Sequence, residues 1–458
     1  MNKFLSHATC VIVGFGSIGQ SVIPLLLDAG LDLGRLHIFD YKNDNAELLA
    51  HYRIRYFNLL RITPENHEAA LGPLLDASTV LLNLAVEVST VDLITLCQAR
   101  GALYIDTSIE PWSYDRDAGA DAIETTNYEL REAVLKFRSG RGAQRSAIVA
   151  HGANPGFVSI LTKVALAKMA RDNAVEVPRG GASRDDWAAL ASELDVRVIQ
   201  ISERDSQVRT AARAEREFVN TWSVEGLIVE SLQPAELGWG THEQVYPKDL
   251  AVGAGPDVPA ISLSSSGMDV KVRSWSPNAL DFVGNLITHN EAISIADYYS
   301  LRKRGELVYR PTCYYAYHAT DLTVDSLSAL SQFGPEHFTR HTVLKDEIIG
   351  GGDELGVLLI SGRHRSLWVG SCLSIEKARK QARFNSATSL QVVSSLVAGI
   401  RWMLENPNCG VRESDELDYE FLLEHSLDYW NPIVMQYTDW PMDGRPELQF
   451  QSFRVATA

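Results

Sequence analysis

The first 155 residues alternate between short apolar runs and stretches in which apolar residues recur at helical spacing. The apolar runs, each expected to form a strand, cover residues 9–13, 36–40, 78–84, 102–106 and 146–150. Helical spacing predicts helices at residues 21–31, 67–75 and 90–100. Strands that alternate with helices favour a parallel, doubly wound sheet with right-handed crossovers. Ligands of such a sheet bind beyond the carboxyl ends of its strands, so the residues that follow each strand are the first candidates for a site.

The pattern changes near residue 195, because residues 196–203 alternate with a period of two, as a half-buried antiparallel strand does. Further strand-like stretches cover residues 309–317, 356–362 and 366–369, so we expect a mixed α+β domain here. Residues 179–186, rich in Gly, Arg and Asp, predict an exposed loop or linker. Residues 375–404 form one long helical pattern, which we expect to return to the first domain and cover its sheet.

The first predicted strand runs into a glycine-rich turn that is typical of nucleotide binding, at residues 14–19. In this pattern Gly14 allows the tight bend, Gly16 lets the backbone approach a pyrophosphate, and Gly19 lets the helix pack close to the strand. The second strand ends in Asp40, where a carboxylate binds both ribose hydroxyls of NAD and repels the extra phosphate of NADP. A glycine turn beside a surface aspartate is the alternative. We predict NAD binding, with contacts from Gly14, Gly16, Ser17, Ile18 and Asp40.

Together these patterns predict an α/β protein with a Rossmann-type doubly wound parallel sheet, a second mixed α+β domain and a C-terminal helical return. We expect residues 1–155 and 376–458 to form the NAD-binding domain. Residues 156–375 are expected to form the domain that binds substrate and dimerises. The tail holds aromatic residues that belong either to an oligomer surface or to the core, namely Tyr419, Phe421, Tyr429, Trp430 and Trp440.

Composition narrows the classes of protein. The chain has 458 residues, 45% of them hydrophobic, which suits two or three globular domains, and no run approaches the roughly 20 apolar residues of a membrane span. Its five cysteines are scattered without a CxxC pair, so we expect reduced thiols and no metal site. The first residues lack the apolar region of a signal peptide, which favours a cytoplasmic protein. A net charge of −16 disfavours nucleic-acid binding and weakly favours a cationic ligand.

Polar residues follow the later strands of the first domain. We expect Asn83, Asp106 and Thr107 to contact the cofactor. Glu87 and Glu110 would place two carboxylates at its nicotinamide end, although each alone is equally well explained as an acid favoured by a helix N-terminus. Asn154 follows the last strand of the domain, where its amide either caps a helix or contacts substrate.

The middle of the chain interleaves acids with tryptophan, as in Glu203, Trp222 and Glu230. Carboxylates bind an ammonium group, and an indole face attracts a cation by roughly 0.5–2 kcal/mol. The alternative is a solvated acidic surface with the tryptophans in the core. His289 is a further candidate, although a single histidine is more often structural. Residues 350–354 predict a flexible acidic turn.

These segments together resemble the bacterial homospermidine synthases, which are relatives of the saccharopine dehydrogenase-like group. The likeness covers nearly the whole chain, and it rests on residues 14–20, 83–90, 106–112, 151–156, 201–207, 218–226, 238–243, 288–292 and 310–315. The resemblance implies a polyamine pocket lined by Glu110, Asn154, Glu203, Trp222, Glu230 and His289. It also implies that Asp353 or Glu354 supplies a carboxylate at the entrance or far end of the pocket. Glu87 stands where the family has an aspartate, which would alter the pocket length.

The resemblance implies an activity as well: two putrescines become homospermidine and ammonia, with NAD reduced and reoxidised in one cycle, in a homodimer. A saccharopine-type amino-acid dehydrogenase or a carboxyspermidine dehydrogenase is the alternative enzyme. Such an enzyme binds substrate carboxylates, ordinarily through Arg or Lys, and Arg204 and Arg310 keep it open. A third alternative is an NAD-binding sensor without catalysis.

Overall fold

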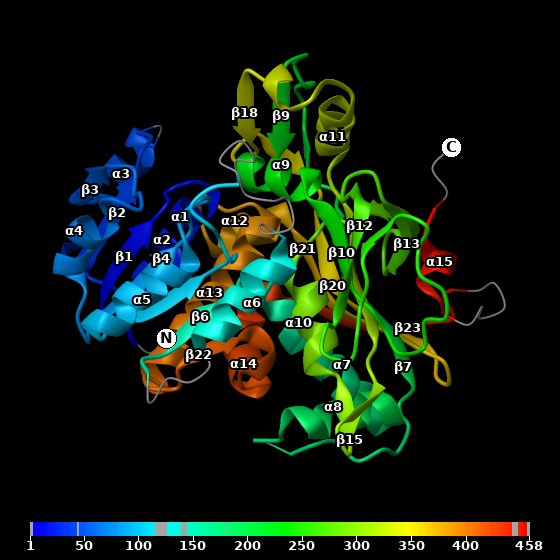
Figure 1. Ribbon diagram of the computed structural model, residues 1–458. Coiled ribbons are helices and arrows are strands. Elements are labelled where there is room, and N and C mark those ends of the chain that lie inside the picture. Colours follow the sequence, from blue (N-terminus) through cyan, green and yellow to red (C-terminus); the bar gives the residue numbers. More distant parts are fainter. Residues whose placement is uncertain are drawn as a thin grey trace. The chain divides into compact units, whose positions relative to one another are not determined.

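The computed structural model describes residues 3–43, 45–114, 126–138, 144–179, 181–441 and 448–455. The chain divides into two compact units, which Figure 1 draws as a ribbon. Unit 1 comprises Met1–Gly156 and Ala378–Ser414, and unit 2 comprises Phe157–Lys377 and Asp415–Ala458. This division differs from the expected one in the tail, because the chain from Asp415 onward belongs to unit 2 and not to the NAD-binding unit.

Unit 1 is built on a sheet of seven strands in the order β22-β6-β5-β4-β1-β2-β3, and every pairing is parallel. The strands are β1 (Thr9–Val13), β2 (Leu36–Asp40), β3 (Tyr56–Leu59), β4 (Thr79–Asn83), β5 (Leu103–Asp106), β6 (Ala147–Val149) and β22 (Val411–Glu413). The first six follow the 3-2-1-4-5-6 order of a dinucleotide-binding sheet, which reverses between β1 and β4. This confirms the predicted Rossmann-type domain.

Seven α-helices belong to the described part of unit 1: α1 (Ser17–Ser21), α2 (Ile23–Asp28), α3 (Ala46–Tyr52), α4 (His67–Leu71), α5 (Thr90–Arg100), α6 (Asn127–Arg138) and α13 (Ala387–Glu405). The helix predicted at residues 21–31 is wrong in its bounds, since α1 ends at Ser21 and α2 begins at Ile23. Pro24, in the first turn of α2, has no N–H with which to continue the bonding of α1.

The single helix predicted at residues 375–404 is also wrong, because the chain forms α12 (Ile375–Gln381) and then α13. Phe384 adopts a left-handed backbone with a φ of 68° between the two helices. Ser386 then caps α13 in a capping box with Ser389, so the polar side chains in this stretch start a new helix. As predicted, α13 packs on the first-domain sheet, where it contacts β5 and β6.

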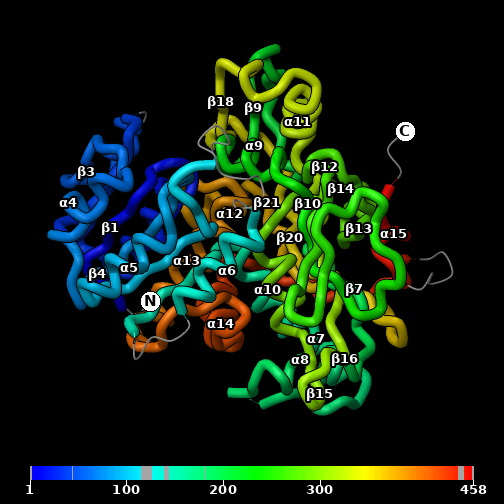
Figure 2. The backbone as a smooth tube through the Cα atoms, viewed as in Figure 1, coloured from blue at the N-terminus to red at the C-terminus, as the bar shows by residue number. Residues whose placement is uncertain are grey.

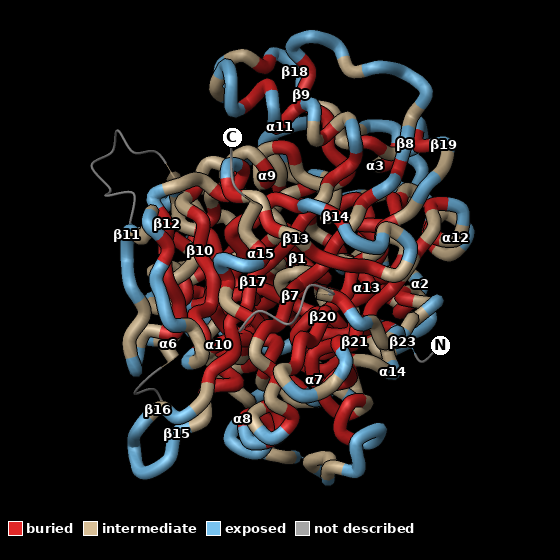
Figure 3. Tube along the Cα trace, turned by 90° about the vertical axis from the view of Figure 1, so that its right-hand side faces the viewer, coloured by how far each residue is buried: buried red, intermediate tan, exposed pale blue. Residues whose placement is uncertain are grey.

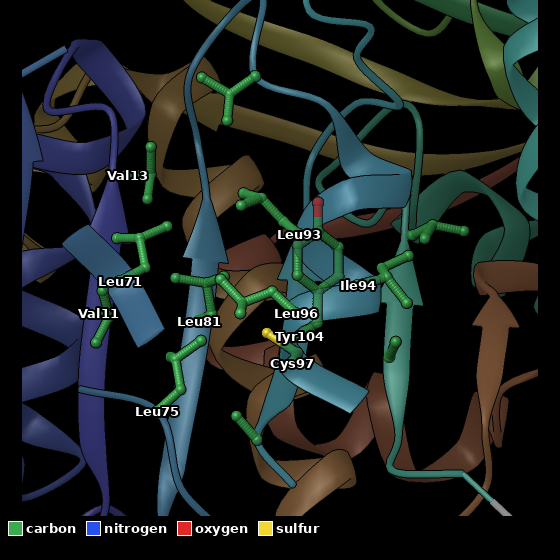
Figure 4. Packing of buried hydrophobic residues seen from close by; sticks show 14 of the residues in the cluster. Val11, Val13, Leu71, Leu75, Leu81, Leu93, Ile94, Leu96, Cys97 and Tyr104 are labelled. Carbon is green, nitrogen blue, oxygen red and sulfur yellow. The ribbon is translucent and has the colours of Figure 1, made fainter. Parts of the chain in front are cut away.

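The core of unit 1 lies between the sheet and its helices. Val11, Leu81 and Tyr104 of three neighbouring strands pack with Leu93 and Cys97 of α5 (Figure 4). Among the described residues, α13 alone has the length and mean hydropathy to cross a membrane, but 78% of that window is buried inside the protein. Such burial is what the core helix of a folded domain shows.

Unit 2 contains a ten-stranded mixed sheet, whose main path runs β11-β12-β10-β17-β7-β20-β21-β23, with β13 and β14 joined to it beside β17. Its strands are β7 (Val196–Asp205), β10 (Pro234–Gly238), β11 (Leu250–Val252), β12 (Ala260–Ser266), β13 (Lys271–Ser276), β14 (Leu280–Asn285), β17 (Thr312–His318), β20 (Gly352–Ser361), β21 (Ser366–Ser374) and β23 (Ile433–Thr438). The pairing of β7 with β17 is parallel, whereas the pairing of β7 with β20 is antiparallel. This confirms the predicted mixed second domain.

Three two-stranded ladders complete the strands of unit 2: β8 (Val208–Arg209) with β19 (Ile348–Gly350), β9 (Glu217–Asn220) with β18 (Arg340–Val343), and β15 (Leu301–Lys303) with β16 (Glu306–Tyr309). Its helices, apart from the connecting α12, are α7 (Phe157–Asp172), α8 (Arg184–Glu193), α9 (Val224–Leu232), α10 (Asn290–Tyr298), α11 (Asp321–Phe333), α14 (Tyr419–Trp430) and α15 (Phe450–Phe453). The linker predicted at residues 179–186 is wrong at its end, since Ser183 caps α8 through a capping box with Asp186; Gly180 lies outside the described residues.

The two faces of the unit 2 sheet have different neighbours. Helices α7 and α10 pack on one face, against β20, β21, β10 and β17. The other face carries the apolar cluster that includes Trp368, Trp440 and Phe453, with α15 against β13. Figure 2 traces the central strands β7, β20 and β21, and Figure 3 shows them as buried while the β15–β16 hairpin is exposed.

The C-terminal segment joins unit 2 through both its helix and its strand. The helix α14 packs against α7, and β23 pairs with β21 from Ile433 to Thr438. Trp430 and Trp440 are buried, so these two rings belong to the core, whereas Tyr419, Phe421 and Tyr429 stay partly exposed.

Candidate functional site

The glycine turn of unit 1 has the shape that the sequence predicts. Gly14 has a φ of 91°, and a Cβ there would lie 2.6 Å from the carbonyl oxygen of Leu84. A Cβ on Gly19 would lie 2.3 Å from the carbonyl oxygen of Gly14, so neither position tolerates a side chain. A Cβ on Gly16 would meet nothing within 4 Å. The Gly16 backbone therefore borders open space, which is what a pyrophosphate-binding turn requires.

Asp40 is the last residue of β2 and is tied to this turn. Its Oδ2 accepts the backbone N–H of Phe15 at 2.5 Å, and its Oδ1 accepts the N–H of Lys42 at 2.7 Å. Ser17 and Ile18 are the first residues of α1, directly after Gly16. The structure thus brings the five residues predicted at the phosphate and ribose end together at the carboxyl ends of β1 and β2.

Asn83 and Asp106 lie inside a buried polar network and are not exposed to a ligand. The Asp106 carboxylate accepts the Tyr104 hydroxyl at 2.7 Å, the Thr90 hydroxyl at 2.8 Å and the Ala150 N–H at 2.6 Å. Burial raises the pKa of Asp106 to about 7, against these hydrogen bonds. Asn83 donates to the carbonyl of Val88 and to the Tyr104 hydroxyl. Both side chains hold the loops after β4, β5 and β6 in place.

Glu87 and Glu110 are joined through the backbone of Glu87 and not through their carboxylates. The backbone N–H of Glu87 donates to Oε2 of Glu110 at 3.0 Å, and the Ser108 hydroxyl donates to Oε1 of Glu110 at 2.8 Å. The Glu87 side chain takes a different direction, because its carboxylate lies 3.5 Å from Arg61 and accepts the N–H of Tyr114 at 3.2 Å. Of the two acids, Glu110 is buried and Glu87 is half-buried.

The loop after β6 carries Asn154 and lies against α13. Gly152 donates its N–H to the carbonyl of Pro155 at 2.7 Å, and Thr107 and Val392 surround Gly152. Asn154 is half-buried, three residues before the start of α7. Since α13 leads into the parallel strand β22, its N-terminus lies at the same sheet edge as this loop. The sequence pattern did not predict that α13 contributes to this edge.

In unit 2, strand register places several polar residues on one face of the sheet. Tyr317 and Leu355 are the cross-strand partners of Glu203, and Asp353 is the partner of Asp205. Cross-strand partners project to the same face, so the buried side chains of Glu203, Asp205, Tyr317 and Asp353 share it. We call this set, together with Tyr315, Trp222, Glu230, His289 and Glu291, the polar cluster of unit 2.

Trp222 is held in this cluster from two sides. Its indole Nε1–H donates to the Tyr317 hydroxyl at 3.3 Å. The hydroxyl of the preceding Thr221 donates to the buried Asp205 carboxylate at 2.6 Å. Ser223, the next residue, caps α9 by accepting the N–H of Gly226, so the helix start fixes the loop that carries the indole. The ring itself remains half-buried.

His289 lies between two carboxylates. Its Nε2 is 3.0 Å from Glu230 and its Nδ1 is 3.2 Å from Glu291, while its ring stacks on Tyr315 at 4.5 Å between centroids. Burial alone lowers the pKa of His289, but Glu291 and Glu230 outweigh burial and raise the pKa well above its ordinary value. This arrangement favours the protonated imidazolium form of His289 at neutral pH, which the sequence did not indicate.

The expected flexible turn at residues 350–354 is wrong from Gly352 onward, where β20 begins. Only Gly351, with a φ of 87°, turns the chain, because the next residues pair with both β7 and β21. Asp353 and Glu354 are neighbours in a strand and so project to opposite faces. Asp353 joins the polar cluster, whereas Glu354 accepts the N–H of Asn278 on the other side of the sheet. The structure thus separates two residues that the sequence left equivalent.

The polar cluster includes residues that the sequence did not single out, namely Asp205, Glu291, Tyr315 and Tyr317. The two tyrosines lie in an unbroken run of apolar and aromatic residues, 313–317, which predicts a strand but does not show which face each ring takes. Their partners became visible only through the register of β17 with β7. Among the described residues, no group of three or more His, Cys, Asp or Glu side chains could hold a metal ion.

Comparisons with known proteins match nearly the whole chain. The family model "Saccharopine dehydrogenase NADP binding domain" matches residues 10–149, and "Saccharopine dehydrogenase C-terminal domain" matches residues 152–431. The homospermidine synthase of Blastochloris viridis is 43% identical over 454 residues, covering 96% of this chain and 93% of that protein. The homospermidine synthase of Mesorhizobium japonicum is 41% identical over 447 residues, covering 96% and 92%. The chain belongs to the homospermidine synthase family.

A solved structure supports the same assignment. The crystal structure of the Legionella pneumophila homospermidine synthase in complex with NAD superposes with a TM-score of 0.91 at 38% identity, over 98% of each chain. The Saccharomyces cerevisiae saccharopine dehydrogenase shares the fold alone, with a TM-score of 0.51 and 10% identity over 94% of this chain and 99% of that one. Membership of the homospermidine synthase family confirms the resemblance that the sequence motifs carried.

Proposed function

We propose that this chain is a homospermidine synthase that joins two putrescine molecules and releases ammonia, with NAD reduced and reoxidised in one cycle. One observation carries the proposal. Glu203, Trp222, Glu230 and His289, which are spread over 87 positions of the sequence, gather in one polar cluster of unit 2. A half-buried indole beside several carboxylates suits a cationic polyamine.

The described residues of unit 1 fit NAD. Gly16 leaves room for the pyrophosphate, and the Asp40 carboxylate at the end of β2 suits ribose hydroxyls and repels a 2′-phosphate. We therefore propose NAD as the cofactor, although the matching family model is described as NADP-binding. When bound, NAD supplies a hydride acceptor that later returns the hydride, so the reaction has no net redox change.

The side chains of the polar cluster have three tasks in this reaction. Carboxylates bind the ammonium groups of the diamine and so fix the position of its reacting carbon in the site. The Trp222 face stabilises positive charge that develops on the substrate. A carboxylate also accepts a proton from the attacking amine, because an alkylamine with a pKa near ~10.4 is protonated at neutral pH.

A dehydrogenase that binds a substrate carboxylate would need a free arginine or lysine side chain. The two candidates for that role, Arg204 and Arg310, do not favour such an enzyme. Arg310 is buried and donates to the backbone carbonyls of Trp239 and Gly255. Arg204 donates to the carbonyls of Asp205 and Ala319 and lies 3.6 Å from Asp321. Both guanidinium groups thus bond within the protein.

Incubation of the purified protein with putrescine and catalytic NAD⁺ tests the proposal. We expect homospermidine and ammonia, measured by mass spectrometry and an ammonia assay, without build-up of NADH absorbance. Steady NADH accumulation would identify a plain dehydrogenase. The absence of any turnover, with NAD still bound, would leave a non-catalytic NAD-binding protein.

We also propose that the chain works as a homodimer in the cytoplasm. The partly exposed Tyr419, Phe421 and Tyr429 of α14 offer aromatic surface for an interface. Its described cysteines are free thiols, as expected for a reducing compartment. Light scattering on a size-exclusion column tests the dimer, and a mass near 50.6 kDa would contradict it. Cell fractionation tests the location.

A further inference from the structure

Two tyrosines of β17 link the parts of the polar cluster to one another. Tyr315 and Tyr317 project to the same face because they are two positions apart on the strand. Their rings stack at 5.4 Å between centroids, with 17° between the ring planes. Tyr315 also stacks on His289, and the Tyr317 hydroxyl accepts the indole N–H of Trp222. The four rings form one continuous row.

The Tyr315 hydroxyl adds a contact to a residue outside this row. It donates to Oε2 of Glu203 at 2.6 Å, and both residues are buried. A hydroxyl that donates to a carboxylate at this distance forms a charge-assisted hydrogen bond, which is about twice as strong as a neutral one. Glu203 is the partner of Tyr317 in the β7–β17 register, so the Tyr315 hydroxyl reaches it diagonally across the two strands.

The structure assigns to Tyr315 a positioning role in polyamine binding: its hydroxyl fixes the Glu203 carboxylate while its ring fixes the His289 imidazolium. This inference rests on the proposed function. Tyr315 would then set the distance between the Glu203 carboxylate and the group formed by Glu230, His289 and Glu291. That separation determines where the ammonium end of a diamine lies relative to the rest of the site.

The ring contact is suited to this role because the two carboxylates beside His289 favour its positively charged form. Glu230 and Glu291 hold the imidazole protonated, and a cation stacked on a phenol ring is attracted by the electron density of the ring face. A buried imidazolium with two carboxylates on its edges and a ring on its face has little freedom to rotate. Glu230, which is more exposed than Glu291, then presents its carboxylate in one direction.

Strand β17 also contains a residue suited to a matched control variant. Tyr314, the neighbour of Tyr315, projects to the opposite face and is equally buried. Its hydroxyl accepts the side-chain N–H of Gln200 at 2.6 Å, within the apolar cluster of that face. Tyr315→Phe and Tyr314→Phe therefore each remove one buried hydroxyl from adjacent positions of one strand. Only the first of these changes touches the polar cluster.

The test compares these two variants in the full-length protein, each saturated with NAD. The Tyr315 hydroxyl stabilises ionised Glu203, so its removal raises the pKa of that carboxyl. Binding of an ammonium group needs Glu203 ionised. We therefore expect the acid limb of the kcat/KM profile for putrescine to move up by about 1 pH unit in Tyr315→Phe. Tyr314→Phe should keep the wild-type profile even if its thermal stability falls by a similar amount.

Other groups on this face are the same in both variants, so they do not produce the difference. The titratable neighbours are Tyr317 on β17, Asp205 on β7 and Asp353 on β20, with His289 beyond the Tyr315 ring. An acid limb in Tyr315→Phe that coincides with the wild-type and Tyr314→Phe limbs overturns the proposal.

A second measurement separates this inference from the proposed function. In protein labelled with ¹³C at glutamate carboxyl groups, the Glu203 resonance is assigned by its loss in Glu203→Gln. Its titration midpoint should rise by about 1 unit in Tyr315→Phe and stay unchanged in Tyr314→Phe. If the wild-type protein makes no homospermidine, the proposed function fails, yet this titration still decides whether Tyr315 controls Glu203. An unchanged midpoint refutes the positioning role.

Discussion

Unit 1 and unit 2 both place polar groups on a sheet. The two units differ in the contacts that fix these groups in position. In unit 1 the turn at residues 14–19 and the loops after the strands are shaped by backbone conformation and by the buried Asp106 network. In unit 2 the functional side chains hold one another, as in the row from Trp222 through Tyr317 and Tyr315 to His289.

The difference follows from the ligands that we propose. The phosphates of a dinucleotide are bound largely by backbone N–H groups. Glycines allow the main chain to approach them closely and helix N-termini supply the N–H groups, so few charged side chains are needed. A flexible diamine offers only two charged ends, so the protein must fix charged side chains at set distances. Changes in unit 1 should therefore alter cofactor binding, and changes in unit 2 should alter polyamine use at constant cofactor affinity.

The largest effect is expected in the glycine turn. Gly16→Ala should weaken NAD binding about 100-fold, equivalent to about 2.7 kcal/mol, because the new methyl occupies space that the pyrophosphate needs. Its thermal stability should stay unchanged, since nothing lies within 4 Å of that Cβ. Calorimetric titration with NAD⁺ measures the loss.

Gly14→Ala is the matched control for folding. Its positive φ and the 2.6 Å approach to Leu84 should lower the free energy of unfolding by about 1–3 kcal/mol. Denaturant unfolding measures this change. Equal stability losses in the two variants would show that Gly16 is structural and would remove the distinction between them.

In unit 2, Trp222→Ala should lower kcat/KM for putrescine about 30-fold, the equivalent of a 2 kcal/mol cation–π contribution. NAD affinity should not change. Trp222→Phe, which keeps a ring but loses the N–H bond to Tyr317, should give an intermediate value. Near-normal product formation by the alanine variant would contradict the role of the indole face.

A smaller effect separates two neighbouring acids. Asp353→Asn should lower kcat/KM for putrescine about tenfold, because Asp353 lies on the face of the polar cluster, and tenfold corresponds to about 1.4 kcal/mol. Glu354→Gln changes a side chain on the opposite face, next to Asn278, and should leave the kinetics unaltered. The same loss in both variants would contradict the assignment of faces.

The smallest effect is a pH dependence of stability that comes from His289. Its pKa is raised in the folded protein by Glu291 and Glu230. The associated stabilisation is fully present below the unfolded value near ~6.5 and is lost as pH rises through the folded value. The difference in unfolding free energy between wild type and His289→Gln should therefore shrink as pH rises from about 6.5 through the folded pKa of His289. A difference that grows with pH would mean that His289 is neutral in the folded state.

Much of unit 1 follows from the sequence because its information is local. Strand Thr9–Val13, the three glycines and Asp40 lie within one short segment, and each has one structural role. The errors arose where a neighbouring residue overrides helical spacing, as Pro24 does between α1 and α2 and as Ser386 does before α13. The tail was placed with the wrong unit because helical spacing does not say which sheet a helix covers.

Unit 2 was less predictable from spacing, because its site depends on pairings between distant segments. Trp222 meets Tyr317 across 95 positions, and Tyr315 meets Glu203 across 112. Without these pairings, spacing alone favours a solvated acidic surface with the tryptophans in the core. The whole-chain resemblance, and not the spacing, supplied the candidate residues there.

By itself the sequence determined the two classes of domain, the nucleotide turn and the family, because periodicity and short motifs are local properties of the chain. Only the tertiary structure decided that Asp353 and not Glu354 joins the cluster, that two carboxylates flank His289 and raise its pKa, and that two tyrosines connect the rest. Those outcomes depend on strand register and on burial beside specific charges. Both are set by packing between residues that lie far apart in the sequence.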